Sequence, residues 1–160
     1  MTRIVAATPQ TMPLIEDGLR ALARDLGDPY EADRDRLERA LFAPAPACQG
    51  VLALSDGAEA LRGIAVFSPF LSTMRGAVGI FVSDLWVAGE ARGAGLGPRL
   101  LAAAARRGRT LWQASHLRLI SYDDNPRAGA FYGAMGFTPH TGETTLRLDG
   151  AAFDALARTE

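Results

Sequence analysis

Val82-Ser-Asp-Leu-Trp-Val-Ala-Gly-Glu-Ala-Arg-Gly-Ala-Gly-Leu-Gly-Pro-Arg-Leu-Leu101 joins an apolar strand to a glycine-rich turn, and the turn opens a helix. Glycine tolerates positive φ angles and lets a backbone approach a ligand closely. Successive N–H groups in such a turn form an anion-binding nest, and the helix adds the positive end of its dipole. The stretch therefore predicts a phosphate-binding loop around Arg92, Gly93, Gly95 and Gly97.

The spacing of this turn excludes two familiar phosphate loops. A mononucleotide P-loop requires Lys and then Ser or Thr after its last glycine, and neither follows Gly97 here. The interval from Gly93 through Gly95 to Gly97 also differs from the G-x-G-x-x-G turn that binds dinucleotides. The remaining pattern is Arg-x-x-Gly-x-Gly after a strand that ends at Val87.

A second motif follows in Asn125-Pro-Arg-Ala-Gly-Ala-Phe-Tyr-Gly-Ala-Met-Gly-Phe137. The two motifs, in this order and with a strand between them, resemble the GNAT family of acyl-CoA-dependent N-acetyltransferases. The pattern is most similar to the diamine and thialysine acetyltransferase type. Ser83 is a departure, because those relatives often carry Glu at this position.

The order of the elements, together with the resemblance, predicts a mixed α/β (α+β) fold with three layers. The sequence indicates a mixed sheet with helices on both faces. The resemblance implies a GNAT-like fold with a mostly antiparallel, twisted sheet of about six or seven strands, in which the fourth strand splays from the fifth to admit the cofactor. Residues 1–160 are expected to form a single N-acetyltransferase domain.

Hydrophobic periodicity and turn residues place the individual elements. Strands are expected at 3–7, 50–55, 60–68, 78–87, 117–122, 137–140 and 144–148, and helices at 13–26, 31–42, 96–107 and 126–135. Asp56-Gly57 predicts a hairpin turn, 69–75 an irregular loop, and 151–157 one or two weak helical turns.

The composition narrows the classes of partner and compartment. The chain of 160 residues is 48% hydrophobic and 22% charged, as in ordinary globular domains, and its net charge of -1 makes nucleic acid an unexpected partner. All 17 basic residues are Arg, which with the abundant Ala and Gly indicates a GC-rich bacterial genome. Cys48 is the only cysteine, which favours a reducing cytoplasm. Neither a membrane span nor a signal-peptide core is expected.

The resemblance implies that acetyl-CoA binds as co-substrate. Asn125 is also explained as a helix N-cap, and the two roles are compatible. The residues expected to contact acetyl-CoA are Leu85, Trp86, Val87, Arg92, Gly93, Ala94, Gly95, Leu96, Gly97, Asn125, Ala128, Phe131 and Tyr132.

Two side chains are candidates for catalysis. Tyr132 matches the tyrosine that protonates the departing thiolate in the family, although an aromatic packing role is the alternative. Asp84 lies inside an apolar strand, where an ionised carboxylate is costly unless it faces a cleft or a partner. It could bind a cationic amine or relay its proton, or it could form a structural salt bridge.

Weaker candidates for the acceptor side are Tyr30, Glu31, Ser72, Met74 and Ser83, together with Asp84. His116 and His140 match no metal-ligand spacing, and no metal is expected.

The resulting hypothesis is an N-acetyltransferase that transfers acetyl from acetyl-CoA to a primary amine of a small molecule in a ternary complex. A protein or peptide N-terminal acetyltransferase, or a catalytically idle acyl-CoA sensor, are the alternatives. Homodimers are common in the GNAT family, so the resemblance implies a possible homodimer.

Overall fold

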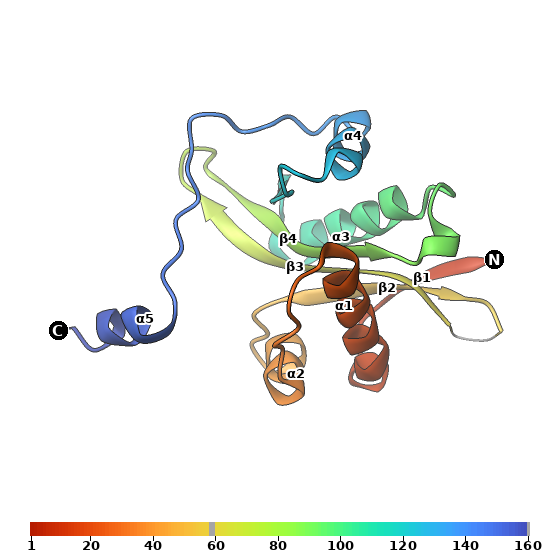
Figure 1. Ribbon diagram of the computed structural model, residues 1–160, viewed down its shortest axis with the longest axis horizontal. Coiled ribbons are helices and arrows are strands. Elements are labelled where there is room, and N and C mark those ends of the chain that lie inside the picture. The colour runs from red at the N-terminus through yellow and green to blue at the C-terminus, as the bar shows by residue number, and fades with distance from the viewer. Residues whose placement is uncertain (58–59, 160) are drawn as a thin grey trace. The chain divides into compact units, whose positions relative to one another are not determined.

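The computed structural model describes residues 1–57 and 60–159 and divides into two compact units, Met1–Ser121 and Tyr122–Glu160. The first unit contains a sheet with helices, and the second contains two short helices joined by an extended segment (Figure 1). The expectation of one domain over the whole chain stays a prediction.

The first unit is built on a mixed sheet with the order β1-β2-β3-β4-β5. The first four strands pair antiparallel, and β4 pairs with β5 in parallel. Their bounds are β1 Thr2–Ala6, β2 Gln49–Ser55, β3 Leu61–Ser72, β4 Ala77–Val87 and β5 His116–Leu119. The mixed, mostly antiparallel sheet is confirmed, but the described residues form five strands instead of six or seven.

Helices cover both faces of this sheet, as predicted (Figure 1). On one face lie α1 (Met12–Leu26) and α2 (Arg34–Phe42), and on the other lies α3 (Leu96–Trp112); short 3₁₀ turns, η1 (Pro9–Thr11) and η2 (Gly89–Ala91), precede α1 and α3. The helix expected from residue 31 begins only at Arg34, because Asp33 caps it by accepting a hydrogen bond from the Arg36 N–H at 2.9 Å. The third helix continues five residues beyond its expected end at 107.

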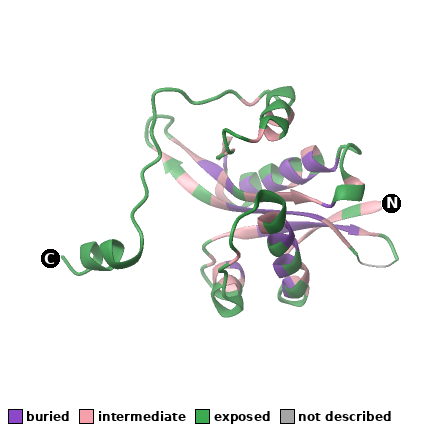
Figure 2. Ribbon diagram, in the orientation of Figure 1, coloured by how far each residue is buried: buried purple, intermediate pink, exposed green. Residues whose placement is uncertain are grey.

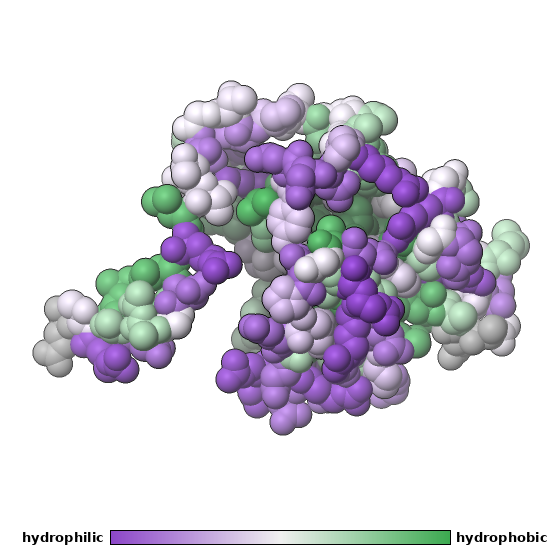
Figure 3. Space-filling model, in the orientation of Figure 1, coloured by the Kyte–Doolittle hydropathy of each residue, from purple (hydrophilic) through white to green (hydrophobic). Residues whose placement is uncertain are grey.

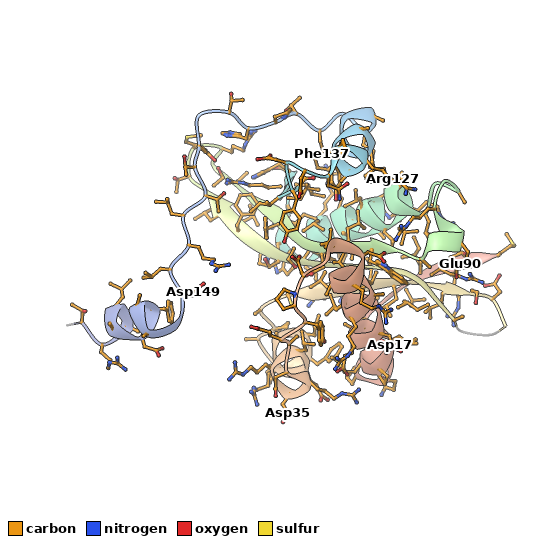
Figure 4. The ribbon with its side chains drawn as sticks, in the orientation of Figure 1. Asp17, Asp35, Glu90, Arg127, Phe137 and Asp149 are labelled. Carbon is orange, nitrogen blue, oxygen red and sulfur yellow. The ribbon has the colours of Figure 1, made fainter. Side chains whose placement is uncertain are left out.

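The core is buried on both faces of the sheet (Figure 2). Met12, Ile15 and Leu19 of α1 pack against Ile64 and other residues of β2 and β3. Glycines bring the helices close, since a Cβ at Gly18 would lie 2.8 Å from Ile64 Cγ2. The outer faces of α1 and α2 are hydrophilic (Figure 3) and carry the exposed Asp17 and Asp35 (Figure 4). This is the amphipathic pattern that the sequence predicted.

A one-residue bulge at Ser83 changes which face of the sheet the end of β4 presents. Val66 pairs with Asp84 but Phe67 pairs with Val82, so Ser83 is the extra residue. Phe67 packs edge-on against Trp112 of α3, whereas Val66 belongs to the core beneath α1. Paired residues share a face, so the bulge turns Asp84 toward α1 and α2.

The prediction of an irregular loop at 69–75 is wrong in part, because β3 continues through Pro69 to Ser72. The pairing of β2 with β3 ends at Gln49 and Phe67, so beyond this point one edge of β3 has no neighbouring strand among the described residues. Proline is tolerated at such an edge because its missing N–H costs no ladder hydrogen bond.

The two strands expected at 137–140 and 144–148 are also wrong. Residues 137–149 contain no strand, and the second unit consists of α4 (Pro126–Ala134), this segment and α5 (Gly150–Ala157). A strand is stable only when its backbone pairs with a neighbour, and none pairs with this segment among the described residues. Gly142, at φ +85°, interrupts the apolar alternation, and Leu146 remains 87% exposed.

We predict that Gly63→Ala destabilises the protein by about 1–3 kcal/mol, because overpacking forces the surroundings to shift. A Cβ at Gly63 would lie 2.8 Å from both Leu100 Cδ1 and the backbone oxygen of Trp86. Gly89→Ala is the matched control, since its Cβ would meet nothing within 4 Å. Urea unfolding measures both, and equal stabilities would contradict the close packing of α3 on β3.

Candidate active site

The glycine-rich loop has the backbone conformation that the sequence predicted. Gly93 and Gly95 have φ angles of +80° and +73°, which favour glycine over other residues. A Cβ at either glycine would meet nothing within 4 Å, so the surface above the loop is open. Gly95 is the N-cap of α3, so the N–H groups of Leu96 and Gly97 have no partner within the helix. The loop thus offers free N–H groups at a helix N-terminus, which suits a phosphate group.

The Arg92 side chain folds back from this loop. Its Nε donates to the backbone oxygen of Val87 at 2.9 Å, and its Nη2 donates to Asp25 of α1. The indole N–H of Trp86 donates to the same oxygen of Asp25 at 3.0 Å. The guanidinium is therefore bound to the scaffold, and the groups that the loop itself offers to a phosphate are backbone N–H groups.

The end of β4 leaves its parallel neighbour just before Asp84. Pairing with β5 covers only Gly79–Val82, whereas pairing with β3 continues to Val87. Residues 83–87 therefore have no strand on the β5 side among the described residues. Backbone groups that no ladder uses can bind an extended ligand. The splay between the fourth and fifth strands, which the resemblance implied, is thus present in the register.

Asp84 lies at this divergence in an electrostatically costly position. Burial raises the pKa of the Asp84 carboxyl, and a hydrogen bond from the Ser83 hydroxyl, 2.6 Å away, acts in the opposite direction on that pKa. The Ser83 hydroxyl also lies 3.3 Å from the backbone oxygen of Val66. The bulge therefore supplies Asp84 with a hydrogen-bond donor from the adjacent residue.

Two further ionisable groups face Asp84 from the α1–α2 side. Burial raises the pKa of Tyr30, and the negative charges of Glu16 and Asp84 act in the same direction. Burial and the Asp84 charge likewise raise the pKa of the Cys48 thiol. The Tyr30 hydroxyl is buried and has no hydrogen-bond partner among the described residues. The three groups thus lie within electrostatic range of one another.

Glu16 holds the cationic groups around Tyr30 in place. It accepts hydrogen bonds from Arg20 at 2.6 Å and from Arg34 Nε at 2.8 Å, and these bonds lower its pKa. The Arg20 guanidinium lies over the Tyr30 ring, 4.3 Å from its centroid. The Tyr30 ring is thereby held against α1 by Arg20, and Glu16 links this arginine to Arg34 at the start of α2.

The second unit carries the residues of the second motif. Asn125 is the N-cap of α4 and accepts a hydrogen bond from the Ala128 N–H at 3.1 Å, so the capping role is present. The Tyr132 ring packs edge-on against Phe131 and Phe137, with centroids 5.0 and 5.4 Å away. Burial raises the pKa of the Tyr132 phenol, which stays protonated at neutral pH.

The structure does not bring all the expected acceptor residues to Asp84. Ser72 pairs with Ala77, and Met74 is exposed in the following turn; both lie about 20 Å or more along the strand from Asp84, at ~3.3 Å per residue. Glu31 is exposed beside Tyr30. The contacts of all these residues with acetyl-CoA or an acceptor stay predictions.

Sequence reasoning missed Asp25, Glu16 and the position of Cys48. An acidic residue in an amphipathic helix is ordinarily solvated, so Asp25 gave no signal. Glu16 directly follows the apolar pair Leu14 and Ile15. This position beside the apolar side of the helix was the one sign in the sequence that Glu16 is not fully exposed.

Within residues 1–57 and 60–159, no cluster of His, Cys, Asp and Glu suits a metal ion. Nor does this part of the chain contain a helix with the length and apolarity needed to span a membrane.

Comparison with solved structures shows the same fold in acetyltransferases. A probable acetyltransferase is 26% identical with a TM-score of 0.78, covering 93% of this chain and 98% of that one. The ribosomal-protein-alanine N-acetyltransferase of Brucella melitensis is 18% identical with a TM-score of 0.74, covering 92% and 100% of the two chains. An aminoglycoside N-acetyltransferase in complex with CoA is 18% identical with a TM-score of 0.74, covering 92% and 95%.

A comparison with curated proteins found no match. The family model described as "Acetyltransferase (GNAT) family" matches residues 19–137, a range that includes the glycine-rich loop, the divergence of β4 from β5 and the second motif. The chain belongs to the GNAT acetyltransferase family.

Proposed function

We propose that the protein is an acetyl-CoA-dependent N-acetyltransferase that acts on a primary amine of a small molecule by direct transfer in a ternary complex. The observation that carries the proposal is the divergence of β4 from β5 at Ser83. It leaves the β5 side of residues 83–87 without a neighbouring strand among the described residues, next to Asp84 and shortly before the glycine-rich loop.

The residues present fit acetyl-CoA. The open N–H groups of Leu96 and Gly97 suit the pyrophosphate, and Gly93 and Gly95 leave room for it. The free edge of β4 at Leu85 suits an extended, amide-containing arm, whereas the backbone oxygen of Val87 already accepts a hydrogen bond from Arg92. When bound, acetyl-CoA supplies an acetyl group activated as a thioester.

The acceptor amine belongs on the face of β4 that carries Asp84. An amine must lose a proton to attack a thioester, and a carboxylate with a raised pKa is a better proton acceptor than an ordinary one. The neighbouring Tyr30 hydroxyl is buried and has no hydrogen-bond partner among the described residues. Transfer then forms the N–C bond and breaks the C–S bond, while the amine proton passes to Asp84, directly or through water.

A covalent enzyme intermediate on Cys48 is not part of this proposal. Its raised pKa keeps the thiol protonated, and its sulfur donates weakly to the backbone oxygen of Ala40 at 3.6 Å. A thiol in that state is a poor nucleophile. Tyr132, a protonated phenol, is the proposed donor of a proton to the departing thiolate.

The test of this function is release of the CoA thiol from acetyl-CoA in the presence of diamines, lysine analogues, amino acids, aminoglycosides or short peptides. We expect turnover on one class of small amine. The absence of lysine keeps background self-acetylation low. Turnover on peptides alone would favour the N-terminal acetyltransferase, and tight binding without turnover would favour the sensor. A failure to bind acetyl-CoA would overturn the proposal.

Tyr132→Phe should lower kcat about 100-fold, a typical contribution of a general acid, with little change in acetyl-CoA affinity. Tyr122→Phe removes a phenol hydroxyl from the same unit and serves as the control. Steady-state kinetics with the best amine measure both variants. An unchanged kcat for Tyr132→Phe would remove Tyr132 from the mechanism.

The pH dependence of kcat/KM should report Asp84. Activity that needs the carboxylate falls as pH decreases through its raised pKa. Because the hydrogen bond from Ser83 lowers that pKa, Ser83→Ala should move the acidic limb to higher pH, whereas Asp84→Asn should remove the limb and reduce kcat/KM. A limb at the same pH in all three proteins would assign it to another group.

Asp84→Asn should also stabilise the protein at neutral pH. The pKa of Asp84 is higher in the folded state than in the unfolded chain, so the folded protein holds the extra proton between these two values. Ionisation therefore costs stability, fully above the folded pKa and not at all below the unfolded value of ~3.9. Urea unfolding should show the variant more stable near pH 7 and equal to wild type near pH 4. The exposed Asp17→Asn is the control, and a less stable Asp84→Asn at pH 7 would contradict the cost of burial.

A further inference from the structure

Asp25 connects three elements at the entrance to the glycine-rich loop. It lies in the last turn of α1, and its Oδ2 accepts from Trp86 at the end of β4 and from Arg92 just before the loop. These partners are 61 and 67 residues away in the sequence. Neither family motif includes Asp25, and the proposed chemistry gives it no task.

The hydrogen bonds of Arg92 hold the residue that leads into the loop. The side chain is held at Nε by the Val87 oxygen and at Nη2 by Asp25, and the backbone N–H donates to Gly89 at 3.3 Å. Gly93, the next residue, begins the left-handed backbone of the loop. The position of Arg92 thus determines where the loop starts and in which direction it leaves the strand.

The loop needs such an anchor because its glycines are permissive. Gly93 and Gly95 can adopt many backbone conformations, and binding must select the one that points the N–H groups at the ligand. Holding a loop in its bound conformation beforehand improves affinity by reducing the entropy lost on binding. The side chains of Asp25 and Arg92 are 44% and 36% exposed, so their ion pair itself contributes only modestly to stability.

We propose that Asp25 is a positioning residue for acetyl-CoA: through Arg92 and Trp86 it holds the glycine-rich loop and the end of β4 in the arrangement that binds the cofactor. The inference rests on the proposed function, because it assigns Asp25 a role in the binding of the same co-substrate. It places part of the cofactor-binding affinity in α1, on the far side of β4 from the helix that the loop opens.

The test is calorimetric titration of acetyl-CoA into wild type, Asp25→Asn, Arg92→Gln and the double variant. Each single variant should raise the Kd about threefold to tenfold, in the range of partly exposed charged hydrogen bonds. The double variant should be no weaker than the weaker single variant, because both remove the same interaction. In Asp25→Asn the KM for acetyl-CoA should rise in parallel with the Kd.

Two matched variants separate positioning from loss of charge or of folding. Asp17→Asn removes the same charge from an exposed site on α1 and should leave the Kd unchanged. Asp25→Glu keeps the carboxylate and should retain most of the wild-type affinity for acetyl-CoA. This variant tests the inference even if thermal unfolding shows that Asp25→Asn is poorly folded.

Wild-type binding with an equal Kd for Asp25→Asn would overturn the inference. Tighter binding by that variant would also overturn it, since Asp25 would then be competing with phosphate for Arg92. If wild type itself fails to bind acetyl-CoA, the proposed function fails instead, so the two failures are distinguishable.

Discussion

The extra residue in β4, Ser83, is the constraint on which the site depends. Without it, Asp84 would follow the alternation of Val82 and face α3; with it, Asp84 and Trp86 face α1 and α2. The same bulge stands where β4 ceases to pair with β5. One inserted residue thus turns the carboxylate toward α1 and α2, at the point where the strand edge beside it has no neighbour among the described residues. Bulges commonly re-aim side chains next to active sites in this way.

Much of the first unit could be predicted from the sequence, because its signals are local. Leu14, Ile15 and Leu19 recur at the helical period, and the glycines of the loop indicate positive φ angles that other residues rarely adopt. The prediction of strands at 137–140 and 144–148 was wrong for the opposite reason. A strand exists only through its neighbour, and alternation over four or five residues indicates a capacity to pair without specifying a partner.

The candidate site was predictable where the motif determines backbone conformation and unpredictable where distant side chains meet. The positive φ angles of Gly93 and Gly95 follow from the pattern. The contacts of Arg92 do not, because its partner Asp25 comes from a helix 67 residues earlier. A charged residue on an amphipathic helix carries no local sign of such a task. Only the packing of α1 against β4 brings the two together.

The engagement of Arg92 bears on how this family member would hold a pyrophosphate. Its guanidinium is paired with Asp25, so the motif arginine brings little net positive charge to the loop. Attraction for the phosphates then falls to the N–H groups of the loop and the first turn of α3, where Pro98 already removes one donor. Such dipoles act at short range and depend on exact orientation. A phosphate-binding loop of this kind would gain affinity from rigidity more than from charge, so an acidic residue beside it is physically consistent.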